Sequence, residues 1–341
     1  MGLTHAQTRR SFLQQGAVAA GGLTLAGWLA ACGSGDDDAS GASGSAIKLS
    51  LPTAGGAGSV WRSVIEQDRL LAGGPKVSWV GGDPGQVQTQ LLAKTVDFTV
   101  FGSVTAAQAN AKGNDVLLVG AAINNHGRWL VPANSPYKTP KDLRGKKIAT
   151  QPSNSDTFVQ AAIVAALGGD DLKKDYKLFF GAPAANVALF QRGDVDAIIA
   201  IEPSATRLVA AGAREIARVG DLWQQYTNST QPMLLNGRAV RADQWKARKA
   251  DFEKVVDGFT KANAAIKADP TLLVKYAKAM GLKPTEKKAI ALLPERMKDV
   301  YPDTFDADTL KGLDAQIDQA VKLGLLAAPP KTPVYARDVV A

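Results

Sequence analysis

Three short segments of the chain place glycines and hydroxyl side chains directly after an expected strand: residues 53–56, 102–105 and 151–157. Glycine lets backbone amides approach a ligand closely, and the first amides of a helix have no partner inside the helix. Such segments suit a small anion, for example a carboxylate or a sulfonate. The candidate binding residues in them are Thr53, Ala54, Gly55, Gly102, Ser103, Thr105, Ser153, Ser155 and Thr157.

Each segment also has a purely structural explanation. Residues 53–56 can form a tight turn, and Ser103 or Thr105 can be the N-cap of the helix that follows. In the third segment, Asp156 opens an expected helix over residues 158–167, where its charge would favour the helix dipole and repel an anion. Ligand binding and local capping are both open for these residues.

Three more side chains could contact a ligand. His126 and Arg128 lie where the chain is expected to pass first between two halves of the fold, and Glu202 ends the last expected strand of the second half. Arg128, close to His126, could bind an oxyanion through two parallel hydrogen bonds, or it could be a surface cation. Glu202, directly before Pro203, could accept a hydrogen bond from an amine or a hydroxyl, or it could form a salt bridge at a hinge.

Composition argues against catalysis and against nucleic-acid binding. Beyond residue 31 the chain has one histidine, His126, and one cysteine, Cys32, so no catalytic pairing is apparent except around His126, and metal-ligand spacing is absent. Residues 55–58 follow a strand but lack the third glycine of a dinucleotide loop. The densest basic segment, residues 138–147, has no aromatic side chain for stacking on bases. We expect no catalytic residue, no metal, no cofactor and no nucleic-acid partner.

The first 45 residues resemble an export signal followed by a tether. Residues 8–13 resemble a twin-arginine signal, and the apolar run that follows is shorter than the roughly 20 residues of a membrane span. Residues 29–32 resemble the bacterial lipobox, whose cysteine is acylated. We expect residues 1–31 to be a removed signal peptide, Cys32 to carry lipid, and residues 32–45 to be a flexible tether. The removed segment holds two arginines and no acidic residue, which leaves 38 basic against 32 acidic residues, a mild excess.

Hydrophobic periodicity predicts the same strand-and-helix unit twice. A helical pattern over residues 86–94 changes to period two over residues 96–101, and residues 186–192 and 195–201 repeat this change. Residues 94–98 and 192–196 therefore occupy equivalent points of two α/β lobes, which suits about 300 residues. Other expected strands span residues 47–51, 77–80, 129–131 and 147–150, and other expected helices span residues 60–71, 244–268, 270–280, 285–293 and 307–323.

Eight short stretches of the chain, taken in order, resemble the nitrate/sulfonate/taurine class of ABC-transporter solute-binding proteins. They are residues 51–55, 96–98, 102–103, 141–149, 188–197, 202–203, 305–310 and 324–326. The resemblance implies an α/β, type II periplasmic-binding fold, with two lobes around a ligand cleft and a helical C-terminal part packed on lobe one. It implies that lobe one comprises residues 46–126 and 234–326, that lobe two comprises residues 127–233, and that residues 327–341 form an irregular extension. Two hinges are expected near residues 126–129 and 232–236.

The same resemblance implies a function. It implies an exported, monomeric, lipid-anchored protein that delivers a small organic anion, such as a sulfonate or a carboxylate, to an ABC permease and its ATPase. Members of the class often carry a tryptophan before the Glu-Pro pair, where this chain has Ile201, so ligand identity does not transfer. Nitrate-like ions, taurine and a pyrimidine vitamin precursor are alternative ligands, and an exported enzyme or sensor is an alternative use of the fold.

Overall fold

The computed structural model describes residues 45–339 of the chain. The predicted signal peptide, the predicted acylation site Cys32 and the predicted tether, up to residue 44, lie outside the described residues. Within residues 45–339, no helix combines the length and the apolar character that crossing a membrane requires.

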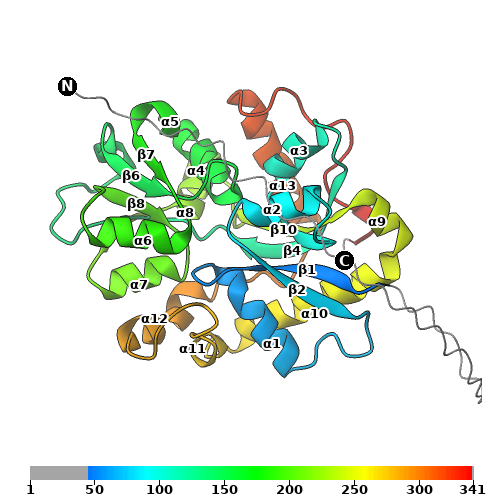
Figure 1. The fold of residues 1–341 in the computed structure, drawn as a ribbon. Helices are drawn as coiled ribbons and strands as arrows, with labels where there is room; N and C mark the ends of the chain where they lie inside the picture. Colours follow the sequence, from blue (N-terminus) through cyan, green and yellow to red (C-terminus); the bar gives the residue numbers. More distant parts are fainter. Residues whose placement is uncertain (1–44, 340–341) are drawn as a thin grey trace, which may run out of the picture. The chain divides into compact units, whose positions relative to one another are not determined.

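The first of two five-stranded sheets has the strand order β2-β1-β3-β10-β4. Strands β1, β2 and β3 are parallel, and β10 runs antiparallel to both β3 and β4. Two helices, α1 and α10, cover one face, and α3 and α13 cover the other (Figure 1). The bounds are β1 (Ile47–Pro52), β2 (Val77–Gly82), β3 (Phe98–Phe101), β4 (Val116–Asn124), β10 (Leu234–Arg241), α1 (Trp61–Gln67), α2 (Gln86–Leu92), α3 (Ser103–Asn110), α10 (Lys249–Ala268) and α13 (Ala307–Lys322).

The second sheet has the same topology, in the order β7-β6-β8-β5-β9. Here β6, β7 and β8 are parallel, and β5 is antiparallel to β8 and β9. Helices α4 and α8 pack on one face, and α6 and α7 pack on the other. The bounds are β5 (Arg128–Val131), β6 (Lys147–Thr150), β7 (Lys177–Phe180), β8 (Ala197–Ala200), β9 (Arg214–Arg218), α4 (Asp156–Leu167), α5 (Leu172–Asp175), α6 (Pro183–Gln191), α7 (Ser204–Ala210) and α8 (Val219–Thr227).

One hydrogen-bond pattern marks the repeat at atomic level. Asp97, before β3, accepts a hydrogen bond from the Lys48 amide at 2.9 Å and donates its own amide to the Lys48 carbonyl at 2.8 Å. Asp196, before β8, forms the same pair with Lys147 at 2.8 and 2.9 Å. The α/β fold class and the equivalence of residues 94–98 and 192–196 are therefore confirmed.

The chain passes between the sheets twice. It leaves the first sheet at Asn124 and enters the second at Arg128, and it leaves the second at Arg218 and re-enters the first at Leu234. Helix α8 occupies part of the return path. An isolated bridge between Gly56 and Pro203 shows that the loops after β1 and β8 lie next to one another.

The C-terminal helices are shorter than periodicity predicts, and they pack beside both sheets, not only on the first. The expected helix over residues 244–268 is divided into α9 (Ala242–Ala247) and α10, and residues 270–280 contain only α11 (Leu272–Lys275). Helix α12 (Lys287–Met297) packs against α7 beside the second sheet, while α10 packs on the first as expected. The contact with α7 uses ion pairs, which apolar periodicity does not reveal: Arg207 lies 2.6 Å from Glu286 and Arg296 lies 2.9 Å from Glu202.

Two other predicted segments differ in detail. The expected helix over residues 60–71 is a 3₁₀ turn (Ala57–Val60) followed by α1, because the chain turns at Arg69 with a φ of 52°. Beyond α13, the chain lies along the outer edge of β4: the Leu118 amide donates to the Val334 carbonyl at 2.7 Å, and Ala336 donates to the Leu118 carbonyl at 2.9 Å. This extension covers a strand edge that would otherwise present unpaired amides. The remaining 3₁₀ turns span Pro140–Leu143 and Arg337–Val339.

Candidate ligand-binding cleft

A small cavity of about 50 Å³ lies where the two sheets meet. Its walls are mostly apolar, and its polar side chains are Gln88, His126, Asp156, Thr157 and Asn236. The lining comes from both sheets, because β1 ends at Pro52 and β8 ends directly before Ile201. Ligands of open α/β folds bind beyond the carboxyl ends of parallel strands, which is where this cavity lies.

Contacts around the cavity join the two halves of the described chain. The Ser204 hydroxyl donates to the Gly55 carbonyl at 3.0 Å, and the Asn154 side-chain amide donates to the Gly85 carbonyl at 3.4 Å. Gly55 has a φ of +99°, and a Cβ there would lie 3.2 Å from Pro183 Cβ and 3.3 Å from Ser204 Oγ. Both the backbone conformation and the close approach therefore require glycine at position 55.

Asp156 is the centre of the polar contacts in the cleft. It is the first residue of α4, and its buried carboxylate accepts hydrogen bonds from Gln88 at 2.8 Å, from Asn236 at 3.3 Å and from the Thr105 hydroxyl. All three donors belong to elements of the first sheet and its helices, whereas α4 belongs to the second. Burial raises the pKa of Asp156, although the hydrogen bonds from Thr105, the Gly102 amide, Asn236 and Gln88 oppose the shift.

His126 reaches the same cavity from the first crossing segment. Its Nδ1 lies 2.9 Å from the Asn124 carbonyl oxygen, which can only accept a hydrogen bond, so Nδ1 carries the proton. Burial lowers the pKa of His126 to about 4, and the nearby charge of Arg128 also lowers it. The imidazole is therefore neutral near pH 7, with a lone pair on Nε2.

Arg128 and Glu202 belong to a buried ion network next to the cavity. Arg128 Nε lies 3.5 Å from Glu202 and 3.9 Å from Glu215, and Arg296 of α12 contacts the same two carboxylates at 2.9 and 2.6 Å. The second oxygen of Glu202 accepts hydrogen bonds from the Thr206 amide and hydroxyl. Both oxygens of Glu202 thus have partners within the protein.

The two hydroxyls at the start of α3 are not N-caps. Gly102 occupies the N-cap position and no side chain caps it. The Ser103 hydroxyl lies 3.3 Å from Gln316 of α13, while Thr105 bonds the Gly102 carbonyl at 3.0 Å as well as Asp156. The capping explanation is wrong for both, because glycine takes the cap position and both side chains point to other partners.

The other candidates from the first and third segments, except Ser153, lie close to the residues that line the cavity. Thr53 donates to Asp83, and Ala54 packs close to Gly281 before α12. Ser155 is the N-cap of α4 and accepts from the Phe158 amide at 3.3 Å. Ser153 is exposed on an outer groove, so of the twelve candidates His126 and Thr157 line the cavity and Ser153 lies apart.

Three residues that matter here were missed by sequence reasoning: Gln88, Asn236 and Arg238. Gln88 and Asn236 hold Asp156, and Arg238 is buried in β10 with its guanidinium 3.8 Å from the ring of Trp61 and 4.2 Å from that of Phe259. Asn236 and Arg238 stand at alternate positions of a strand that ends at Arg241 and otherwise contains Leu, Gly, Ala and Val. Two polar residues at alternate positions of a buried strand were the signal that could have found them.

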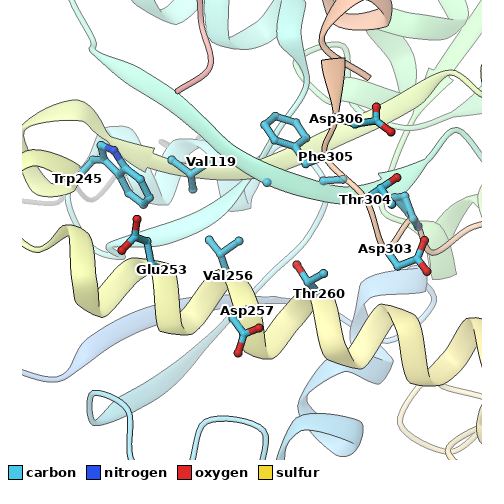
Figure 2. A pocket seen from close by; sticks show the side chains of 13 residues that line it. Val119, Trp245, Glu253, Val256, Asp257, Thr260, Asp303, Thr304, Phe305 and Asp306 are labelled. Atoms are coloured by element: carbon cyan, nitrogen blue, oxygen red, sulfur yellow. The ribbon is translucent and has the colours of Figure 1, made fainter. Parts of the chain in front are cut away.

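A larger pocket of about 540 Å³ lies elsewhere, between β4, α10 and the segment before α13 (Figure 2). Carboxylates of Glu253, Asp257, Asp303 and Asp306 surround it, and none of the twelve candidate binding residues lines it. Within residues 45–339 there is no group of three or more His, Cys, Asp or Glu side chains that could hold a metal ion. The cavity between the sheets is therefore the candidate site.

Comparison with known proteins places this geometry in a family. Residues 76–271, more than half of the chain, match the family model described as NMT1/THI5 like. The chain belongs to the NMT1/THI5-like family. The expected resemblance to solute-binding proteins is thereby confirmed, together with the type II periplasmic-binding fold.

Individual relatives of this NMT1/THI5-like chain differ in sequence identity and in how much of their length the chain matches. A protein of Escherichia coli K12 named "Putative aliphatic sulfonates-binding protein" is 29% identical over 249 residues, 71% of this chain and 70% of that protein. The alkanesulfonate-binding protein SsuA of Xanthomonas axonopodis pv. citri, solved with MOPS bound, superposes with a TM-score of 0.71 at 22% identity and covers 86% of this chain and 99% of that one. An ATP phosphoribosyltransferase of Solidesulfovibrio magneticus is 32% identical over 146 residues, so the chain matches 44% of that enzyme's length.

Proposed function

We propose that this protein is the solute-binding component of an ABC importer, exported and held at the membrane surface by lipid on Cys32. The observation that carries the proposal is the cavity between two α/β units of identical topology, closed by hydrogen bonds from one unit to the other. Membership of the NMT1/THI5-like family and the names of the sulfonate-binding relatives support it.

The proposed moving parts are the two lobes. Lobe one comprises residues 46–126 and 234–326, lobe two comprises residues 127–233, and hinges lie near residues 126–129 and 232–236. A cavity of about 50 Å³ is far smaller than the roughly 300 to 1,000 Å³ of pockets that hold drug-sized ligands. Entry of a ligand therefore requires the lobes to separate, and binding then favours a closed form that docks on the permease.

The proposed ligand class is a small organic molecule with an anionic group, such as a sulfonate or a carboxylate. The names of the relatives support this choice. A pyrimidine vitamin precursor is the second candidate, because the cavity presents a carboxylate to which an amino-substituted ring could donate. Catalysis is disfavoured, because His126 has its Nδ1 proton bonded to a backbone carbonyl and no nucleophile pairs with it among the described residues.

A thermal-shift screen of the full-length protein tests the proposal. The panel contains alkyl sulfonates, aromatic carboxylates, inorganic oxyanions and vitamin precursors. A ligand at 100 times its dissociation constant adds about 2.7 kcal/mol to the free energy of unfolding, which appears as a higher melting temperature. A hit that weakens in a Gln88→Ala variant supports binding in the cavity. A folded protein that responds to no compound contradicts the transport role.

A further inference from the structure

Two arginines from different halves of the fold lie beside the same pair of carboxylates. Arg296 of α12 is 2.9 Å from Glu202 and 2.6 Å from Glu215, and both distances are those of hydrogen bonds. The Nε of Arg128, in β5, is 3.5 and 3.9 Å from the same two residues. This Nε is buried and has no hydrogen-bond partner among the described residues. Arg296 therefore holds both carboxylates, and Arg128 lies next to them without a bond to either through Nε.

The unpartnered N–H of Arg128 needs an explanation. The Arg128 side chain is 9% exposed and that of Glu202 is fully buried. A buried donor without an acceptor is costly, because it has lost its hydrogen bonds to water. A second arrangement, in which Arg128 itself donates to the carboxylates, would remove this cost. The arrangement in this structure is thus one of two that the same four side chains can form.

Three of these four side chains belong to the second sheet. Arg128 is in β5, which lies between β8 and β9. Glu202 follows β8, and Glu215 is in β9. Because hydrogen-bonded strands of one sheet move together, Arg128 stays beside both carboxylates however the two proposed lobes are arranged.

Arg296 comes from the other lobe. Helix α12 buries Leu293 and Met297 in the same apolar cluster as Leu49 of β1, so the helix is part of the core of the first sheet. Its polar side reaches α7 of the second sheet only through hydrogen bonds and ion pairs such as those of Arg296. A rotation of lobe one away from lobe two therefore withdraws Arg296 from both carboxylates.

We propose that the two arginines exchange places when the lobes open. In the closed form Arg296 holds Glu202 and Glu215, and in the open form Arg128 takes both carboxylates. The exchange rests on the proposed two-lobed solute-binding function and adds the switch that joins its two states. Removing one partner of a buried ion pair is strongly destabilising, because a buried charge is left uncompensated. The exchange avoids this cost, so that neither form leaves a buried carboxylate without a cation.

A second ion pair between the lobes has no need of such an exchange. Arg207 of α7 lies 2.6 Å from one oxygen of Glu286, before α12, and 3.1 Å from the other. Their side chains are 21% and 24% exposed, so water can replace either partner when the lobes separate. The carboxylate of Glu202 is fully buried, so a side chain of the protein must replace Arg296 there.

Small-angle scattering from the full-length protein without ligand tests the exchange, because the two arginines act in opposite directions. Arg296→Met removes the cation of the closed form, and Arg128→Met removes the cation of the open form. We expect Arg128→Met to have the smaller radius of gyration and Arg296→Met the larger, with closed-to-open ratios that differ by about tenfold or more. Equal radii or the reverse order would overturn the exchange. Arg62→Met, at an exposed arginine of α1, is the matched control and should keep the radius of the wild type.

Both methionine variants keep one cation beside the carboxylates, so we expect both to fold. If either unfolds, lysine at the same position keeps the charge with fewer donors, and the same order of radii is expected with a smaller difference.

A crystal structure of Arg296→Met without ligand tests the new contact itself. We expect Arg128 to lie within about 3.2 Å of Glu202 or Glu215 in that variant. An Arg128 that stays beyond hydrogen-bond distance of both would overturn the exchange, whatever the radii show. The thermal-shift panel tests solute binding separately: if a compound of that panel binds and the exchange fails, the proposed function still stands.

Discussion

Arg238 lies in an environment that ordinarily excludes a charge. Its side chain is 1% exposed, its Nε and Nη2 have no hydrogen-bond partner among the described residues, and burial lowers the pKa of its guanidinium. Contacts with the faces of Trp61 and Phe259 offset part of this cost, at about 2 kcal/mol for a desolvated cation–π contact. Burying an ion costs several kcal/mol, so the aromatic contacts compensate only partly.

Replacing Arg238 by methionine should therefore not destabilise the fold. We expect Arg238→Met to raise the free energy of unfolding by about 1–3 kcal/mol in urea denaturation, since it fills similar space without a charge. Arg238→Ala is the control, because the space it leaves between the two rings should cost about 2–4 kcal/mol. A methionine variant less stable than the wild type would show that the aromatic contacts exceed the cost of burial.

The buried carboxylate of Asp156 should make stability depend on pH. Burial raises its pKa above the ordinary value of about 3.9, so the folded form binds more protons than the unfolded form above that value. Its contribution to stability is present at low pH and is lost as pH rises through the raised pKa. His126, with a pKa lowered to about 4, acts in the opposite direction between about 4 and 6.5.

The variant Asp156→Asn separates the two groups. Unfolding free energies of wild type and Asp156→Asn, measured between about pH 4 and pH 7, should differ progressively in favour of the variant as pH rises. The His126 contribution is common to both proteins and cancels in the difference. A difference that stays constant with pH would exclude titration of Asp156 in this range.

At the level of single residues, the sequence identified the cleft segments but not their contacts. From the sequence, Asp156 and Glu202 could each have either a ligand-binding role or a structural role. Only the fold shows that neutral donors surround Asp156 and that two arginines lie beside Glu202. Gln88 and Asn236 are 148 positions apart in the chain and meet only because Asp156 of the other sheet lies between them. No local sequence pattern predicts such hydrogen-bond partners.

At the level of elements, Gly55 offers a test of close approach between the lobes. Alanine there would be strained by about 1–2 kcal/mol because φ is +99°, and its methyl group would press on Pro183 and Ser204. We expect Gly55→Ala to lose stability and about tenfold in ligand affinity, which corresponds to about 1.4 kcal/mol. Calorimetry with the tightest-binding compound measures the affinity.

Gly73→Ala is the matched control for this substitution. Gly73 also has a positive φ, of +72°, but a Cβ there would have no neighbour within 4 Å. It should therefore lose stability by a similar amount and keep its ligand affinity. Equal loss of affinity in both variants would mean that the effect comes from backbone strain and not from the contact between lobes.

Elements with strong periodicity were predicted well, and those held by polar contacts were not. Strands β1, β2, β3, β6 and β8 fall within a few residues of their expected ranges, because buried apolar alternation is a local signal. The division at Arg248 between α9 and α10, and the packing of α12 on α7, depend on turn geometry and on Arg207 and Arg296. These contacts link residues about 80 positions apart or more, so no window of sequence contains them.

At the level of the whole molecule, the lipid anchor is open to a direct test. Cys32 is the only cysteine, and a serine there keeps the polarity of the site but cannot be acylated. We expect Cys32→Ser to move the exported protein from the membrane fraction to the soluble fraction on cell fractionation. If the serine variant still sedimented with membranes, retention would depend on another part of the chain.

Closure of the two lobes on a ligand is the central claim, and small-angle X-ray scattering tests it most directly. The full-length protein is measured alone and at saturating concentration of the compound that gives the largest thermal shift. Closing the lobes about residues 126–129 and 232–236 predicts a smaller radius of gyration with ligand, and binding with no change in the radius of gyration would contradict it.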